Sequence, residues 1–278
     1  MDAFYASVEL LRYPELKGQP VVIGGRREHA PRDTPQGRRF ARLRDYTGRG
    51  VITTATYAAR AFGVRSGLGL MKAAQLAPDC LLLPTDFPAY RAMSRRFKAA
   101  VAELAPTIED RGIDEIYIDL SELARQRQGA GHDPLAGLKE VAQEIKNNVR
   151  AATGGLSCSI GLAPNKLLAK IASELDKPDG LTLIRPEDLA GRIWALPVRA
   201  INGVGPKAAA RLEALGIETI GALAAADPDW LRQRFGTHYG DWLHRAAHGQ
   251  DERPVVTHSE PVSISRETTF ERDLDARR

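Results

Sequence analysis

Two adjacent carboxylates, Asp114 and Glu115, stand in the most informative segment of the chain, residues 112–120. Apolar and polar residues alternate after Glu115, which is the period of a half-buried strand. Like charges side by side repel each other and burial adds to the cost, so a bound cation commonly stabilises such a pair. Carboxylate oxygens favour Mg²⁺ or a similar hard ion. A solvated turn between hairpin strands is the alternative, and an Asp-Glu pair alone favours it.

Several polar residues are spaced so that they could hold a phosphate chain. Tyr57 and Arg60 are three residues apart at the start of a predicted helix and therefore share one face of it. Thr54 lies close to the free N–H groups at the N-terminus of that helix. Lys177 follows another predicted helix and offers a point charge. Tyr57 could instead pack into the core, and Lys177 could instead interact with the dipole at the C-terminus of the preceding helix. For each residue considered by itself, this structural alternative is favoured over phosphate binding.

A glycine turn, Gly203-Val204-Gly205, precedes a further predicted helix. Glycines let backbone N–H groups approach a phosphate closely, and a helix N-terminus adds partial positive charge. Lys207 would add a direct phosphate contact of the kind that positions DNA without reading its sequence. An ordinary helix–helix turn is the alternative, but the string GVGPK followed by Leu-Gly-Ile at 215–217 favours DNA binding.

Hydrophobic periodicity and glycine punctuation predict the elements that must position these residues. The predicted helices are 3–12, 55–62, 71–76, 89–104, 138–151 and 165–175. The predicted strands are 20–24, 51–54, 80–83 and 156–162. From about residue 186 the pattern is all helical, up to a polar stretch, 251–278, that ends in a β-like start at 262–265. We therefore expect an α/β fold followed by a helical region.

The composition excludes some classes of protein and indicates others. The chain has 278 residues, 43% of them hydrophobic, and no apolar run of membrane-spanning length. It has no signal peptide, and its two cysteines, Cys80 and Cys158, have no metal spacing, so a cytoplasmic protein without disulfides is expected. The net charge is +4, and residues 26–49 alone carry eight arginines against three acids. Contact with phosphates and a solvated insertion are equally good interpretations of this loop.

The chain resembles the Y-family DNA polymerases, in particular their bacterial DNA polymerase IV branch. The matching strings, in family order, are MDAFYASVE (1–9), TTATYAARAFGVRSG (53–67), GIDEIYIDLS (112–121), CSIGLAPNKLLAKIASELDKPDG (158–180) and INGVGPKAAARLEALGI (201–217). Together these strings are highly specific, although no single one is.

The resemblance implies a palm with a mixed or antiparallel sheet, small fingers, an all-helical thumb with a helix-hairpin-helix, and a C-terminal little finger. The implied boundaries are 1–17 and 86–175 for the palm, 18–85 for the fingers with an Arg-rich insertion at 26–49, and 176–250 for the thumb. Residues 251–278 would be the linker and the start of a little-finger domain.

The resemblance also implies residue roles in template-directed, damage-tolerant DNA synthesis by two-metal nucleotidyl transfer. Asp114 and Glu115 resemble the palm carboxylates that hold two Mg²⁺ ions. Tyr5 resembles the steric gate that rejects ribonucleotides, with Phe4 supporting it. The residues that resemble the triphosphate contacts are Thr54, Tyr57, Arg60 and Lys177. Those that resemble the thumb's grip on primer–template DNA are Gly203, Val204, Gly205 and Lys207.

The chain departs from the family pattern at both ends. Family members begin with a buried strand ending in Asp-x-Asp, and its first aspartate binds both metals. Met1 occupies the position between the two aspartates, where the main-chain carbonyl also binds metal, and Asp2 matches the second, non-essential aspartate. The chain as given is therefore expected to be nearly inactive. It also stops where the little finger would begin, the part in which contacts with a sliding clamp are expected.

Two other functions stay open from the sequence. A non-catalytic DNA-binding remnant would keep the glycine turn and bind duplex in a salt-dependent way. A nucleotidyl cyclase would use paired acids on a palm-like sheet, but it needs neither that turn nor Tyr5. For the polymerase, the expected partners are primer–template DNA and dNTP, and a monomer without membrane contact is expected.

Overall fold

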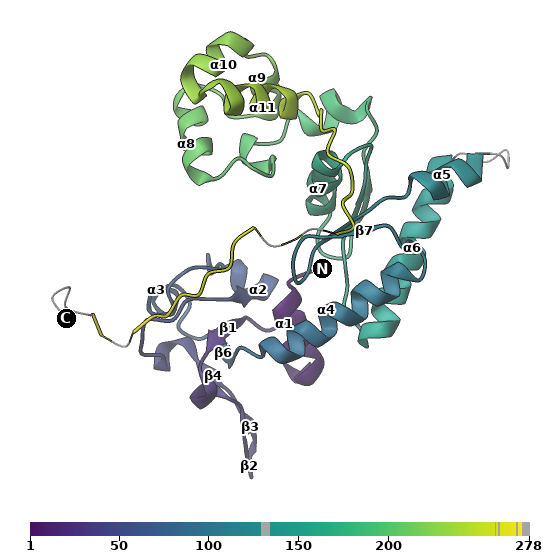
Figure 1. The fold of residues 1–278 in the computed structure, drawn as a ribbon. Coiled ribbons are helices and arrows are strands. Elements are labelled where there is room, and N and C mark those ends of the chain that lie inside the picture. The colour runs from purple at the N-terminus through teal and green to yellow at the C-terminus, as the bar shows by residue number, and fades with distance from the viewer. Residues whose placement is uncertain (129–133, 259, 261, 271, 274–278) are drawn as a thin grey trace.

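The computed structural model describes residues 1–128, 134–258, 260, 262–270 and 272–273, and it confirms the mixed helix–strand class (Figure 1). The helices are α1 Phe4–Arg12, α2 Tyr57–Arg60, α3 Leu70–Leu76, α4 Phe87–Ala102, α5 Ser121–Gln128, α6 Pro134–Thr153, α7 Lys166–Leu175, α8 Pro206–Ala214, α9 Ile220–Ala224, α10 Pro228–Phe235 and α11 Thr237–Ala247. The strands are β1 Val21–Gly25, β2 Arg32–Thr34, β3 Gly37–Arg39, β4 Ala41–Arg42, β5 Thr54–Ala55, β6 Leu81–Pro84, β7 Ile108–Asp110, β8 Ile116–Ile118, β9 Ile160–Leu162 and β10 Leu181–Leu183.

The strands form one four-stranded sheet and three two-stranded sheets in the part of the chain that the structure describes. The larger sheet has the order β4-β6-β1-β5, with β1 and β6 parallel and the outer strands antiparallel to their neighbours. The small sheets are the hairpins β2–β3 and β7–β8 and the parallel pair β9–β10. The acidic segment is therefore a true hairpin, as its alternating pattern predicts.

Three hydrophobic cores hold these elements together. One packs α1, α4 and α6 against β1 and β6, with Tyr90 and Phe97 in its centre. A second lies on the other face of the large sheet, between Val22 and Leu82 and the helix α3. The third joins the helices α8 to α11 to the buried face of α7. Because α7 borders both the acidic hairpin and the C-terminal helices, it connects these two parts of the molecule (Figure 1).

Polar side chains define where several helices begin. Asp86, Asn165 and Asp227 each accept a hydrogen bond from the backbone N–H three residues later, at 3.1, 3.0 and 2.7 Å. Such caps satisfy N–H groups that have no partner inside the helix. The cap at Asn165 fixes the start of α7 and therefore the register of the residues that this helix presents to the site.

A polar clamp holds the segment after α11 against the acidic hairpin. The ammonium group of Lys166 lies 2.6 Å from Glu109 in β7 and donates to the carbonyl of Pro254 at 2.8 Å. Glu109 also accepts from the backbone N–H of Val256 at 2.9 Å. Each charge in this buried pair has an opposite partner, which offsets the cost of desolvation.

The Arg-rich segment 26–49 was expected to be a loop, and this is wrong. It contains the hairpin β2–β3, the short strand β4 and two turns of 3-10 helix. The hairpin residues are exposed or half-buried and mostly charged, so no apolar alternation marks the strands in the sequence.

Other elements differ from prediction mainly in length. The helix expected at 55–62 is the single turn α2. The strand expected at 51–54 is β5, which is shorter and ends one residue later, and the strand expected at 156–162 is the shorter β9. The glycine turn is preceded by one 3-10 turn, Val198–Ala200, rather than a helix. Residues 262–265 form no strand in the described structure. None of the described helices combines the length and apolar character that crossing a bilayer requires.

Gly161 allows β9 to pack directly on α7. A Cβ there would collide with the carbonyl oxygen of Ala169 and lie 2.5 Å from the backbone nitrogen of Ser173. Because backbone cannot move aside cheaply, we expect Gly161→Ala to lower the free energy of unfolding by ~2 kcal/mol or more in urea titrations. Gly191→Ala, where a Cβ meets open space, is the matched control and should change stability far less. Equal effects of both changes would contradict this packing.

Candidate polymerase active site

Asp114 lies at the turn of the β7–β8 hairpin. The turn is closed by a hydrogen bond from the Arg111 N–H to the Glu115 carbonyl at 3.0 Å and by one from the Gly112 N–H to Asp110 at 3.0 Å. Gly112 has φ 149°, a value that suits glycine. The α-ammonium group of Met1 donates to the carbonyl of Asp114 at 2.8 Å, which ties the N-terminus to this turn.

A cleft of about 330 Å³ opens beside Asp114 and gathers most of the residues singled out from the sequence. Those that line it are Met1, Phe4, Tyr5, Thr54, Tyr57, Arg60, Asp114 and Lys177. They come from α1, β5, α2, the β7–β8 turn and the segment after α7. Glu174 of α7 lines the cleft as well, so the fold brings two carboxylates, two phenol rings and two cationic side chains from distant parts of the chain into one space.

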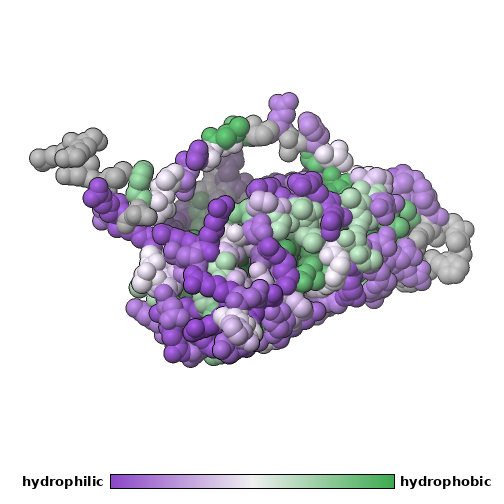
Figure 2. Space-filling model, turned by 90° about the horizontal axis from the view of Figure 1, so that it is seen from below, coloured by the Kyte–Doolittle hydropathy of each residue, from purple (hydrophilic) through white to green (hydrophobic). Residues whose placement is uncertain are grey.

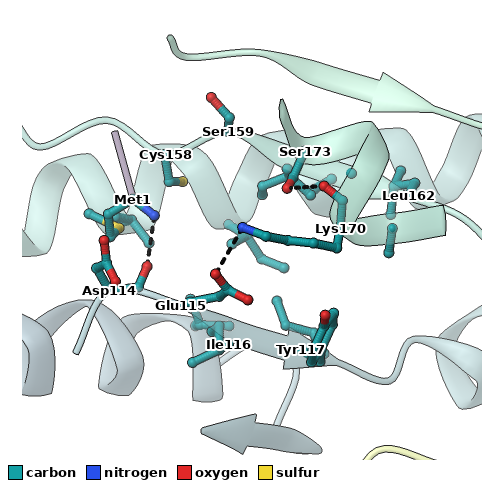
Figure 3. Close-up of a pocket in the computed structure, with 18 of the residues that line it drawn as sticks. Met1, Asp114, Glu115, Ile116, Tyr117, Cys158, Ser159, Leu162, Lys170 and Ser173 are labelled. Carbon is teal, nitrogen blue, oxygen red and sulfur yellow. Dashed lines mark hydrogen bonds and ion pairs between the residues drawn. The ribbon is translucent and has the colours of Figure 1, made fainter. Parts of the chain in front are cut away.

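Glu115 faces an adjoining cavity of about 300 Å³ (Figure 3). Its carboxylate lies 2.9 Å from the ammonium group of Lys170 on α7. Asp114, Met1 and Lys177 line both spaces, so the two cavities meet at the acidic turn. The two neighbouring carboxylates thus point in different directions. Asp114 lines the cleft with Tyr5 and Arg60, whereas Glu115 faces the adjoining cavity and pairs with Lys170.

An alternating series of charges runs along α7 and past its end. Lys170 bridges Glu115 and Glu174 at 2.9 Å each, and Glu174 also lies 3.2 Å from Lys177. Burial alone would lower the pKa of Lys170, but hydrogen bonds to its two carboxylates raise it above the ordinary value. Burial would raise the pKa of Glu174, and the two lysines outweigh this and lower it. Both groups are therefore charged near neutral pH.

Asp2 holds the loop that carries Lys177. Its carboxylate accepts hydrogen bonds from Ser157 at 2.9 Å, from Ser159 at 2.7 Å and from the Asp179 N–H at 2.9 Å. Burial would raise the pKa of Asp2, but these donors outweigh it and lower the pKa below its ordinary value. Asp2 thus fixes the loop at 177–180 from within rather than contributing an open ligand.

Tyr5 and Tyr57 are presented differently. Tyr5 stacks on Tyr90 with centroids 4.4 Å apart and meets Phe87 edge-on, so its ring is held in one place. Burial and the charge of Asp114 raise the pKa of Tyr5. The guanidinium of Arg60 lies 4.9 Å from the centre of the Tyr57 ring, as the three-residue spacing predicts. Both α2 side chains therefore face the cleft as one unit.

The oxygen donors near the acidic turn are few. The described residues contain no group of three or more His, Cys, Asp or Glu side chains placed to hold a metal ion. The donors singled out from the sequence are the carboxylates of Asp114 and Glu115 and the main-chain carbonyl of Met1; the Glu174 carboxylate lines the same cleft but is paired with Lys170 and Lys177. They are hard oxygen atoms of the type that Mg²⁺ prefers, but one carboxylate is engaged by Lys170.

The glycine turn lies at the other end of the molecule, before α8 (Figure 1). Gly203 has φ 116°, and a Cβ there would lie 2.6 Å from the indole ring of Trp242. Gly205 is the N-cap of α8, where a Cβ would meet open space, and Lys207 is exposed in the first turn. Val204 is buried in the third core. An exposed helix N-terminus with a flanking lysine is suited to a phosphate group.

Comparisons with known proteins identify the family. A model described as the impB/mucB/samB family matches residues 1–174, and one described as DNA polymerase-iota, thumb domain, matches residues 199–251. A DNA polymerase IV of Methanoculleus marisnigri is 41% identical over 273 residues, which are 98% of this chain and 68% of that protein. The chain belongs to the Y-family DNA polymerases. It is thus by family a DNA-directed DNA polymerase, a nucleotidyltransferase.

Further relatives and solved structures agree with this Y-family membership. A DNA polymerase IV of Halorhodospira halophila is 42% identical and matches 97% of this chain and 68% of that protein. The crystal structure of DinB from Sulfolobus solfataricus superposes with a TM-score of 0.74 at 30% identity, covering 91% of this chain and 67% of that one. An insertion ternary complex of Dbh DNA polymerase superposes with a TM-score of 0.73 at 29% identity, covering 91% and 67%.

The sequence did not identify two residues of this Y-family site, Lys170 and Glu174, or Thr56, which positions α2 beside it. Lys170 and Glu174 are four residues apart on α7, and with Lys177 they form a spacing of four and three that marks one helix face. This spacing could have identified Lys170 and Glu174 as neighbours of Lys177 in the site. Thr56 caps α2 through the N–H of Ala59 at 3.3 Å and also accepts from the Val21 N–H at 3.0 Å. A threonine directly before a predicted helix was the signal in this case.

The hydrogen bonds of Asp2 make stability depend on pH. Its folded pKa is lowered, so its contribution is complete above the unfolded value of about 4 and is lost as pH falls through the lower folded value. We expect Asp2→Asn to lower the free energy of unfolding by ~1–3 kcal/mol at pH 7 in urea titrations, with a smaller difference at pH 3. Glu187→Gln, an exposed carboxylate, is the control. A difference for Asp2→Asn that is as large at pH 3 as at pH 7 would contradict this role.

Proposed function

We propose that this chain is the core of a template-directed DNA polymerase of the translesion type, which transfers a deoxynucleotide from dNTP to a primer 3′-OH. One observation carries the proposal: a single cleft brings Asp114 together with Tyr5, Tyr57, Arg60 and Lys177. A cleft lined by Arg60 and Lys177 beside a carboxylate suits a nucleoside triphosphate, whose phosphates would meet the cations. The family relation to DNA polymerase IV proteins supports the same reaction.

The domain boundaries remain a proposal that the cores support. We assign 1–17 and 86–175 to the palm, 18–85 to the fingers, 176–250 to the thumb and 251–278 to a linker and the start of a little finger. The core on the outer face of the large sheet lies within 22–82, which fits the fingers. The family match at 199–251 falls within the proposed thumb, apart from its last residue.

Each residue of the cleft then has a role. Arg60 and Lys177 neutralise the triphosphate, and the hydroxyls of Tyr57 and Thr54 donate to its oxygens. Tyr5, fixed by Tyr90, occupies the space of a ribose 2′-OH, with Phe4 beneath it. At the other end, the turn at 203–205 and Lys207 hold the backbone of the primer–template duplex. The sheet, the α7 loop and the aromatic stack fix these groups before substrate arrives.

The donors at the acidic turn fit Mg²⁺ in kind. Asp114, Glu115 and the Met1 carbonyl would hold two ions, which supply the charge that activates the primer hydroxyl and stabilises the leaving pyrophosphate. For this, Glu115 must exchange Lys170 for the metal, and Lys170 retains Glu174 as its partner. Two carboxylates are too few to balance two divalent ions beside a triphosphate, so a further carboxylate is needed at the position before Met1.

The cavity beside Glu115 supports this completion of the site. It runs between β8 and β9 and is lined by Ile116, Ile118, Ile160 and Leu162, with Met1 at one end. Within the described residues, β8 and β9 each belong to a two-stranded sheet and have a pairing partner on one side only. Two open strand edges with apolar side chains between them are suited to an added extended strand.

The test compares this chain with one that carries an apolar strand ending in Asp directly before Met1. We expect the chain as given to extend a primer at least ~100-fold more slowly, since it lacks a metal ligand. A version with Asn in place of that Asp is the matched control and should stay slow. Equal extension by all three would overturn the metal-site assignment. Salt-dependent duplex binding without Mg²⁺-dependent dNTP binding in any version would instead show a non-catalytic DNA-binding protein.

The role of Tyr5 is tested separately, in the chain with the added Asp. Tyr5→Ala should raise the ratio of ribonucleotide to deoxyribonucleotide incorporation by ~100-fold, because the ring no longer fills the 2′-OH space. Tyr5→Phe keeps the ring and is the matched control, so its ratio should stay close to that of the parent. An unchanged ratio for Tyr5→Ala would exclude the steric gate while leaving the polymerase assignment intact.

A further inference from the structure

The hairpin β2–β3 projects from the body of the molecule, at the end opposite to the C-terminal helices (Figure 1). It lies within the Arg-rich segment 26–49, whose eight arginines and three acids account for the whole basic excess of the chain. Neither the cleft nor the glycine turn uses any of these residues.

The register of this hairpin sorts its charges onto two faces. Arg32 pairs with Arg39 and Asp33 pairs with Arg38 across the two strands. Directly paired residues point to the same face, and successive residues along a strand point to opposite faces. One face therefore carries a matched Asp–Arg pair, and the other carries two arginines side by side.

The face with Arg38 is anchored to the body of the protein. Arg38 lies 2.9 Å from Asp33 and 3.1 Å from Glu15, and its guanidinium lies 5.5 Å from the centre of the Tyr13 ring. Phe40, directly after β3, meets the same Tyr13 ring edge-on with centroids 5.8 Å apart. These contacts fix the direction in which the hairpin projects and turn the opposite face outward.

On the outward face, two arginines repel each other and no carboxylate of the described chain neutralises them. Arg32 and Arg39 are both exposed, and in the described parts of the chain neither has an ion pair. Like charges directly opposite each other in a hairpin are destabilising. Figure 2 views the molecule from the side toward which the hairpin projects, where hydrophilic residues dominate the surface. A polyanion would relieve this repulsion by bridging both guanidinium groups.

We propose that Arg32 and Arg39 bind the phosphate backbone of the single-stranded template ahead of the polymerase site. This rests on the proposed function, which places the duplex at the turn 203–205 and the nucleotide in the cleft. The hairpin lies at the end of the molecule opposite to the helices α8 to α11 (Figure 1). A template strand that continues beyond the cleft, away from the duplex, would therefore approach it. Two adjacent arginines are suited to successive phosphates and carry no base preference.

The experiment measures binding rather than synthesis, so it is independent of the metal site. Fluorescence anisotropy compares a primer–template that has a 12-nucleotide 5′ overhang with a blunt duplex of the same paired length, over a range of salt. Arg32→Ala/Arg39→Ala should weaken binding to the overhang substrate roughly tenfold and reduce the slope of log affinity against log salt by about 1.4. Binding to the blunt duplex should stay unchanged.

The matched control is Arg125→Ala/Lys139→Ala, which removes the same charge from exposed positions on α5 and α6. An equal loss for the control, or an equal loss on the blunt duplex, would show only a general effect of net charge and overturn the proposal. Unchanged binding of the hairpin variant to the overhang substrate would also overturn it, and the face would then be free for an acidic protein. Overhang-dependent binding without primer extension would leave the proposal standing while the proposed catalysis fails.

Discussion

The site depends on one electrostatic constraint: several carboxylates must be confined together, so cations have to be interleaved with them. α7 meets this constraint with Lys170 and Glu174 spaced four residues apart, so that Glu115 and Glu174 each face an ammonium group, while Asp114 lines the cleft. Removing charges from water is costly unless each finds an opposite partner. The alternating series therefore holds the Glu115 carboxylate in place, and on the proposed function a metal ion would exchange partners with Lys170 rather than bury a new charge.

The rigidity of α7 follows from how closely it is packed and capped. Gly161 lets β9 lie against its backbone, Asn165 fixes its first turn, and Asp2 fixes the loop after its last. Its buried face belongs to the same hydrophobic core as the C-terminal helices. The cleft and the glycine turn are consequently attached to one element, and the packing of α7 sets the distance between the two proposed binding sites.

The sequence predicts those features of the site that arise between residues close together in the chain, and it does not predict contacts between distant residues. Local spacing predicts that Tyr57 and Arg60 share a face, and the alternation after Asp114 predicts the hairpin. The pairing of Glu115 with Lys170 joins residues 55 positions apart, and no local pattern encodes such a contact. The hairpin β2–β3 escaped prediction because strands without a buried face have no apolar period to detect.

The basic groups of this protein fall into two kinds with different physical consequences. Lys170 and Lys177 are partly buried and already paired with acids. An anion that binds them would therefore displace an internal carboxylate, and few salt ions would be released into solution. Arg32 and Arg39 are exposed and have no such partner in the described chain. A nucleic-acid strand that binds them would therefore release the counterions condensed on its own phosphates. On the proposed assignments, salt would therefore weaken mainly the binding of a nucleic-acid strand by the hairpin, and much less the binding of a nucleotide in the cleft. The affinity of this chain for a nucleotide would then stay nearly constant while its affinity for the strand falls with rising ionic strength.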